Sequence, residues 1–139
     1  MKLTTYLTFR GNAGEAIKLY EKAFGAKVLG LMHFGDMPSS PGMPPVPEEI
    51  KGLVLQALLD FGSAQIRVSD TMPGNTVLTG NNVSIAVTLD TTEQVNAVWN
   101  VLVNGGTINM PLQKTFFSPC YGDLTDRYGV NWKLMAEKE

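Results

Sequence analysis

The residue types that most often do chemistry in proteins are scarce in this chain of 139 residues. His33 is its only histidine, and Asp36, Glu48 and Glu49 are the acids that follow it. One imidazole cannot build a metal site by itself, although a histidine at the end of a strand can transfer a proton. We expect His33 to be a strand-end side chain at the rim of a ligand site, with a role in proton transfer as the alternative.

Two further groups have the chemistry of a nucleophile or an acid. Cys120 is the only cysteine, so neither an internal disulfide nor a cysteine-based metal site can form within one chain. Its place beside Pro119 is typical of a small packed side chain rather than of a nucleophile. Asp70, in the sequence SDTMPG, is expected to form an Asx turn rather than to serve as a catalytic acid.

The charge and hydropathy of the chain argue against other classes of function. With a net charge of −2 and a pI near 5.4, the chain has no surplus of basic residues to neutralise phosphates, so we expect no nucleic-acid partner. No apolar run approaches the roughly 20 residues that span a bilayer, so we expect no membrane association and a cytoplasmic location. The length suits one domain, residues 1–139, with a core that needs no disulfide or metal.

Two segments of the chain repeat one pattern of a strand followed by a helix. We expect these repeated elements to position the residues of a ligand site. The stretch 83–106 is expected to form a strand followed by a helix, and a similar stretch begins 79 residues earlier. In both stretches the helix positions i, i+3, i+4 and i+7 match, a spacing that buries one helix face. The aligned pairs are Val95 with Ala16, Val98 with Leu19, Trp99 with Tyr20, and Leu102 with Ala23.

Each copy of the pattern is predicted to be a strand, a helix and three strands. Asn12 should cap the first helix, which ends at Phe24, and Asp90 or Thr91 should cap the second. The two copies are modules of about 1–72 and 82–139, which gives an α+β fold of two βαβββ modules. The predicted strands are 3–9, 26–34, 52–61 and 63–69 in the first copy, and 83–89, 107–115, 116–125 and 130–136 in the second.

A proline-rich loop, residues 35–51, interrupts the first copy. It carries five of the eight prolines, so it can neither pair in a sheet nor continue a helix. Loops of this length inside a compact domain are usually functional. We therefore expect the loop to close over a ligand or to contact a second subunit.

The closing sequence FSPCYGDLTDRYGVNWKL and the double β-α-β-β-β order resemble the vicinal oxygen chelate superfamily, which includes glyoxalases, bleomycin-resistance proteins and extradiol dioxygenases. The opening YLTFRGNAGEAIKLYEKAFGAKV, with FGDMP and SDTMPG, resembles its PhnB-like branch, often labelled 3-demethylubiquinone methyltransferase-like. The resemblance implies two modules whose sheets curl into a cup with helices outside, and a homodimer. A methyl donor commonly needs a glycine-rich turn beside an open parallel sheet, whereas GNAGEA is expected only to begin a helix.

Metal-dependent members of this superfamily place four ligands inside the cup, on the first and last strands of each module. The resemblance puts Thr5, Arg67, Ser84 and Lys133 at those positions, with one residue of latitude for Arg67. None of the four is a usual metal ligand, and two carry a positive charge that repels a divalent cation. We therefore expect neither a metal nor another cofactor.

The cup is expected to bind a small anionic organic molecule without a metal. Arg67 and Lys133 would hold the anion, unless they neutralise acids of the chain or of its partner. The competing possibilities are an enzyme that uses a divalent metal on a small oxygenated substrate, and an interaction protein that keeps only the fold. The first strand is expected to contribute Thr5, Leu7 and Phe9 to the lining, with the helix-facing side as the alternative for Leu7 and Phe9. The predicted ligand-binding residues are Thr5, Gln65, Arg67, Ser69, Ser84, Lys133 and His33.

Overall fold

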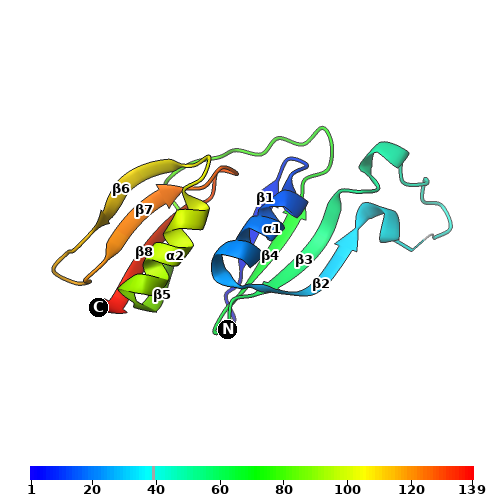
Figure 1. Ribbon diagram of the computed structural model, residues 1–139. Coiled ribbons are helices and arrows are strands. Elements are labelled where there is room, and N and C mark those ends of the chain that lie inside the picture. The colour runs from blue at the N-terminus through cyan, green and yellow to red at the C-terminus, as the bar shows by residue number, and fades with distance from the viewer. Residues whose placement is uncertain (39) are drawn as a thin grey trace. The chain divides into compact units, whose positions relative to one another are not determined.

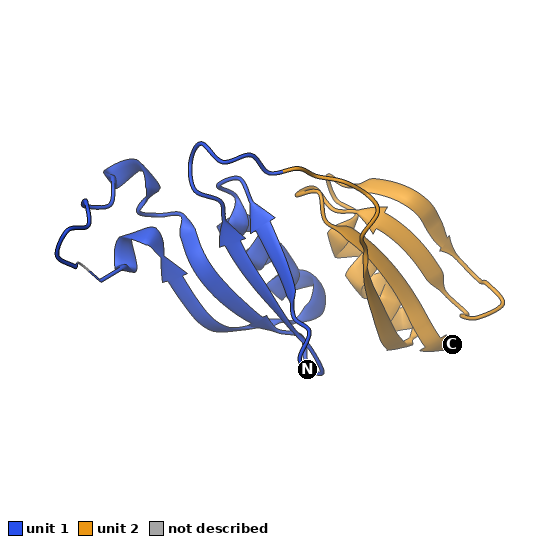
Figure 2. Ribbon diagram, turned by 180° about the vertical axis from the view of Figure 1, so that it is seen from behind, with its two compact units in different colours: residues 1–77 blue, residues 78–139 orange. Residues whose placement is uncertain are grey.

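The computed structural model describes residues 1–38 and 40–139, and the chain forms two compact units, residues 1–77 and 78–139 (Figure 2). In each unit one helix packs on one face of a four-stranded sheet (Figure 1). The element order in each unit is a strand, a helix and three strands, so the predicted doubling of a βαβββ module is confirmed. The closure of the two modules around a shared cup stays a prediction.

The first unit is a sheet in the order β1-β4-β3-β2. β1 runs parallel to β4, while β3 is antiparallel to both of its neighbours. Two single-turn 3-10 helices, Phe34–Asp36 and Glu48–Ile50, lie at the ends of the proline-rich loop, and its described residues contain no strand or α-helix; Ser39 lies outside them. The elements are β1 (Thr5–Phe9), α1 (Ala13–Phe24), β2 (Lys27–His33), β3 (Val54–Asp60) and β4 (Gln65–Asp70).

The second unit repeats this arrangement, with the sheet order β5-β8-β7-β6 and a parallel β5–β8 pair. β7 begins at Tyr121 rather than at Phe116, because residues 115–118 close a turn in which the Thr115 N–H donates to the Ser118 carbonyl at 2.9 Å. The elements are β5 (Ile85–Thr91), α2 (Thr92–Leu102), β6 (Thr107–Gln113), β7 (Tyr121–Thr125) and β8 (Asn131–Lys138).

The helix stripes predicted from the repeat form the centre of each core. All four stripe residues of α2 are buried, and Ala16 and Tyr20 are buried at the aligned positions of α1. Leu19 and Ala23 are only partly buried, and Ile17 completes the buried face of α1 instead. In the second unit these side chains meet Leu124, Trp132 and Leu134, which are fully buried in the strands.

The two helices begin in different ways. Thr91 caps α2 as predicted: its hydroxyl accepts from the Gln94 N–H at 3.3 Å, and the Gln94 side-chain oxygen accepts from the Thr91 N–H at 3.2 Å. The cap predicted for α1 is wrong, because the Asn12 side chain makes no capping hydrogen bond. Its role is taken by Asp70, the last residue of β4.

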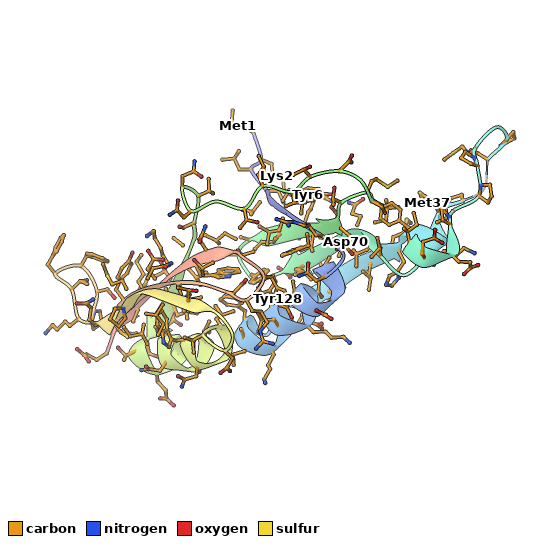
Figure 3. All side chains as sticks on the ribbon, turned by 90° about the horizontal axis from the view of Figure 1, so that it is seen from above. Met1, Lys2, Tyr6, Met37, Asp70 and Tyr128 are labelled. Carbon is orange, nitrogen blue, oxygen red and sulfur yellow. The ribbon has the colours of Figure 1, made fainter. Side chains whose placement is uncertain are left out.

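Asp70 is 5% exposed and lies next to the N-terminal end of α1 (Figure 3). Its Oδ1 accepts from the N–H groups of Gly11 at 2.8 Å and Ala13 at 2.9 Å, and its Oδ2 accepts from the Val54 N–H at 2.9 Å. A carboxylate is favoured at this place because the first N–H groups of a helix are unpaired and carry partial positive charge. Asp70 is therefore a structural clamp between three distant segments instead of a local Asx turn.

A tight turn at residues 126–129 sets the register of the β7–β8 hairpin, as predicted. Gly129 has a φ of 91°, and its N–H donates to the Asp126 carbonyl at 3.0 Å. Thr125 consequently pairs with Asn131, and Asp123 pairs with Lys133.

Candidate functional site

The candidate residues of β4 alternate between the two faces of the first sheet. Ile66 and Val68 are buried under α1, so Arg67 lies on the face that the helix does not cover. On β1 the residue in register with Arg67 is Tyr6, while Thr5 is in register with Ile66. The prediction that Thr5, Leu7 and Phe9 share the face of Arg67 is therefore wrong. A shift of one residue moves every side chain of a strand to the other face, and the apolar Leu7 and Phe9 belong to the core side.

The predicted faces of the second sheet are confirmed. Ile85 of β5 is in register with the buried Trp132, and Ala86 is in register with Lys133. Ser84, which directly precedes β5, therefore falls on the same face as Lys133 by alternation.

Arg67 and Lys133 occupy equivalent positions in the two sheets but have opposite surroundings. On the first strand of its unit, each faces a residue without charge, Tyr6 for Arg67 and Ala86 for Lys133. Across the antiparallel pair, Arg67 faces Leu58, whereas Lys133 faces Asp123. Only one of these two cations thus has a carboxylate beside it in its own sheet.

Arg67 lines a hollow of about 320 Å³ on the uncovered face of the first sheet. No hydrogen bond or ion pair joins its guanidinium to another residue in the described part of the chain. The guanidinium, which is always charged, therefore stands among largely apolar walls. The residues of this Arg67 hollow are Gly30, Leu31, Met32, Gln56, Leu58 and Arg67.

Lys133 lines a second hollow, of about 480 Å³, on the uncovered face of the second sheet. Its Nζ lies 2.6 Å from Asp123 Oδ2, and the hydrogen bond to this carboxylate is the main cause that raises the pKa of Lys133. The ammonium is therefore charged and paired with an acid of the chain, which is the alternative expected for Lys133, while anion binding by Lys133 stays a prediction. The residues of this asparagine hollow are Asn81, Asn82, Ser84, Asn109, Asp123, Asn131 and Lys133.

His33 is not among the residues that line either hollow. It lines a groove of about 360 Å³ between α1 and the end of β2, together with Glu15, Lys18 and Val54. Its Nδ1 lies 3.5 Å from Asp36 Oδ2, and its own N–H donates to the same oxygen at 2.9 Å. The strand-end position is confirmed, and a role in proton transfer stays a prediction.

Gln65 and Ser69, the other predicted residues of β4, line neither the two hollows nor the groove beside His33. Gln65 is partly buried opposite Asp60, and Ser69 is buried in register with Thr8.

Cys120 is buried, and this burial, with a smaller contribution from the negative charge of Glu139, raises the pKa of its thiol. A protonated, buried thiol is inert, in agreement with the packed role expected for it.

No group of three His, Cys, Asp or Glu side chains that could hold a metal ion occurs within the described ranges 1–38 and 40–139. The same ranges contain no helix long and apolar enough to cross a membrane.

Asp123 and the asparagines around it were not predicted from the sequence as site residues. The signal for Asp123 was present, because a hairpin turn at 126–129 that pairs Thr125 with Asn131 also pairs Asp123 with Lys133 two residues further along. Asn109 had no comparable signal, since β6 meets β7 with irregular register.

Comparisons with known proteins agree with this architecture. The model of the family described as 3-demethylubiquinone-9 3-methyltransferase matches residues 1–135, and the chain belongs to this family. The crystal structure of protein PA1353 from Pseudomonas aeruginosa is 30% identical, with a TM-score of 0.88 over 100% of this chain and 99% of that one. A putative 3-demethylubiquinone-9 3-methyltransferase, PhnB protein, from Bacillus cereus is also 30% identical, with a TM-score of 0.77 over 98% and 99% of the two chains.

A more distant structure supports the wider fold. The glyoxylase/bleomycin resistance protein/dioxygenase domain from Frankia sp. EAN1pec is 13% identical, with a TM-score of 0.67 over 98% of this chain and 96% of that one. Both the predicted fold class and the resemblance to the PhnB-like branch of this superfamily are confirmed. Because one such fold hosts unrelated chemistries, the function must be argued from the site.

Proposed function

We propose that the protein binds a small organic anion without a metal, and that Arg67 holds the anionic group. The observation that carries this proposal is the contrast between the two equivalent cations: Lys133 is neutralised by Asp123, whereas Arg67 faces Leu58. A partly buried guanidinium without a carboxylate beside it favours an anionic ligand, because the ligand would supply the missing charge and hydrogen bonds.

The walls of the Arg67 hollow define the rest of the ligand. Met32 and Leu58 present apolar surface, and Gly30 leaves space where a side chain would stand, since a Cβ built there meets no atom within 4 Å. Gln56 adds one carboxamide that can orient a polar substituent. A flat or compact apolar body carrying a carboxylate, phosphate or phosphonate fits these walls.

The methyl-transfer reaction in the family's description has no support in the loop GNAGEA. Its N–H groups at Gly11 and Ala13 already donate to the buried carboxylate of Asp70. A cofactor that used this loop would have to displace a buried, triply bonded charge. We therefore favour binding, or catalysis at the Arg67 hollow, over methyl transfer.

Benzoate is a suitable first probe, because it combines one carboxylate with a flat apolar body. We expect saturable binding by calorimetry, and about tenfold or more weaker binding in Arg67→Met, since a hydrogen bond to a charged group contributes about 1.5–3 kcal/mol. Gly30→Val should also weaken binding, because it fills the hollow without changing charge. Lys27→Met, which removes an exposed cation of β2, is the matched control and should leave binding unchanged.

Metal analysis of the same preparation distinguishes metal-independent binding from the main alternative, a metal-dependent enzyme. Binding that persists in EDTA, in protein without a stoichiometric divalent ion, supports a metal-independent site. A stoichiometric ion whose removal abolishes binding would overturn the proposal and favour a metal-dependent enzyme acting on a small oxygenated substrate.

A further inference from the structure

The asparagine hollow of the second unit differs in chemistry from the Arg67 hollow. Among the described residues that line it, the charged side chains are Lys133 and Asp123, whose Nζ and Oδ2 atoms lie 2.6 Å apart. An anion entering the hollow would meet the carboxylate as well as the ammonium, and a cation would meet the ammonium as well as the carboxylate. The pair therefore gives neither kind of ion a net attraction, and the hollow suits an uncharged ligand.

A chain of hydrogen bonds fixes the polar walls of this hollow. The Asn109 amide nitrogen donates to Asp123 Oδ1 at 3.3 Å and to Thr125 Oγ1 at 3.1 Å. The Thr125 hydroxyl donates to Asn131 Oδ1 at 2.7 Å, and the Asn131 amide nitrogen donates to the Gly80 carbonyl at 2.8 Å. Side chains held in one arrangement lose little conformational freedom when a ligand binds.

The same bonds define which groups remain for a ligand. Because the Asn109 nitrogen makes both of its bonds within the protein, its carbonyl oxygen is the acceptor that it offers. Lys133 has three N–H donors, of which Asp123 takes one, and the Tyr121 side chain also interacts with the ammonium. Asn81 and Asn82 are exposed on the segment before β5 and add further donors and acceptors.

We infer that the asparagine hollow binds an uncharged, polyhydroxylated molecule of the size of a monosaccharide or a cyclitol. A hydroxyl group both donates and accepts, so several of them on one small ring match walls that mix carboxamides with a neutralised ion pair. A hydrocarbon would leave these polar groups unpaired, and a site built for hydroxyls rejects an analogue that lacks them. The volume of about 480 Å³ accommodates such a ring together with bound water. This inference does not depend on the proposed role of Arg67.

The probe for this site is myo-inositol, an uncharged ring with a hydroxyl on every carbon. Titration is followed by the side-chain amide signals of the asparagines in two-dimensional NMR spectra of the whole chain. We expect saturable shifts of the Asn109 signal, and no saturable shifts with cyclohexanol, the ring with a single hydroxyl. Asn109→Ala should weaken inositol binding about tenfold, the effect of one well-placed hydrogen bond.

Two variants serve as controls. Asn100→Ala, on the exposed side of α2, removes an asparagine outside the hollow and should leave binding unchanged. Arg67→Met should also leave it unchanged, which separates this site from the benzoate site. The inference is overturned if inositol causes no saturable shift of the hollow's amide signals, if cyclohexanol binds as tightly, or if folded Asn109→Ala binds inositol as the unchanged chain does.

Discussion

Asp70 has the side chain of a possible catalytic acid, but its role in the structure is to hold the first unit together. Its carboxylate is buried and accepts from three backbone N–H groups, so its removal would leave these donors without their acceptor, and the bonds of Ala13 and Val54 are buried. Each unpaired donor costs about 1–3 kcal/mol. We therefore expect Asp70→Ala to lower the free energy of unfolding by about 3–5 kcal/mol.

Denaturation with urea measures this loss. The free energy of unfolding of Asp70→Asn should lie between those of the unchanged chain and Asp70→Ala, because asparagine keeps an acceptor oxygen but lacks the charge. Asp90→Ala is the control, since this aspartate is exposed at the end of β5. A loss below about 1 kcal/mol in Asp70→Ala would show that the carboxylate does not act as a clamp.

The face on which Arg67 lies could be predicted from the sequence, whereas the contacts of Asp70 could not. Strict alternation in QIRVS was enough to put Arg67 on the face away from Ile66 and Val68. The partners of Asp70 lie up to 59 residues away in the chain, and no local pattern connects it to Gly11 or Val54. The preference for asparagine at the residue before a helix instead predicted Asn12 as the cap of α1.

At the scale of elements, the packing of α2 on the second sheet depends on the absence of a side chain at Gly122 of β7. A Cβ at this position would lie 2.7 Å from Trp99 Cζ3 and 2.8 Å from Leu112 Cδ2. Trp99 is buried in the core face of α2, so it has little room to move. Gly122→Ala should therefore destabilise the protein by about 1–3 kcal/mol through overpacking.

The unfolding midpoint and the tryptophan fluorescence of Gly122→Ala test this prediction. Gly30→Ala is a matched strand glycine in β2, where an added Cβ meets no atom within 4 Å, and its midpoint should stay close to that of the unchanged chain. Equal midpoints for the two variants would contradict the role given to Gly122.

Element order was easier to predict than element ends. Both helices were expected from their apolar stripes, and the turns at residues 60–63 and 126–129 were expected from glycine at positions that have positive φ, Gly62 and Gly129. β7 was predicted five residues too long, because the aromatic residues Phe116 and Phe117 suit a strand by composition. They lie instead in the connection between β6 and β7, where the turn at Thr115 ends the pairing.

At the scale of the whole molecule, two exposed aromatic residues form an apolar cluster on the surface. Phe116 is fully exposed and Phe117 is half exposed, with ring centroids 5.2 Å apart, and Phe117 also contacts the Tyr121 ring at 5.1 Å. Exposed apolar clusters of this kind commonly mark an interface. We propose that a second copy of the chain covers them, as the resemblance to the superfamily implies.

Sedimentation equilibrium measures the assembly directly. We expect a mass close to twice 15.1 kDa for the unchanged chain, and a shift toward the monomer in the double variant Phe116→Ser, Phe117→Ser. Leu3→Ser replaces another exposed apolar residue and should not change the mass. A monomer in the unchanged chain at all accessible concentrations would reject the proposed dimer.

The clamp at Asp70 also has a consequence for synthesis. The ribosome adds Gly11 and Ala13 to the chain 59 and 57 residues before Asp70, and Val54 16 residues before it. Their N–H groups are therefore synthesised before the carboxylate that accepts from them. The first unit can therefore form its three hydrogen bonds to Asp70 only after this last residue of β4 has been added to the chain.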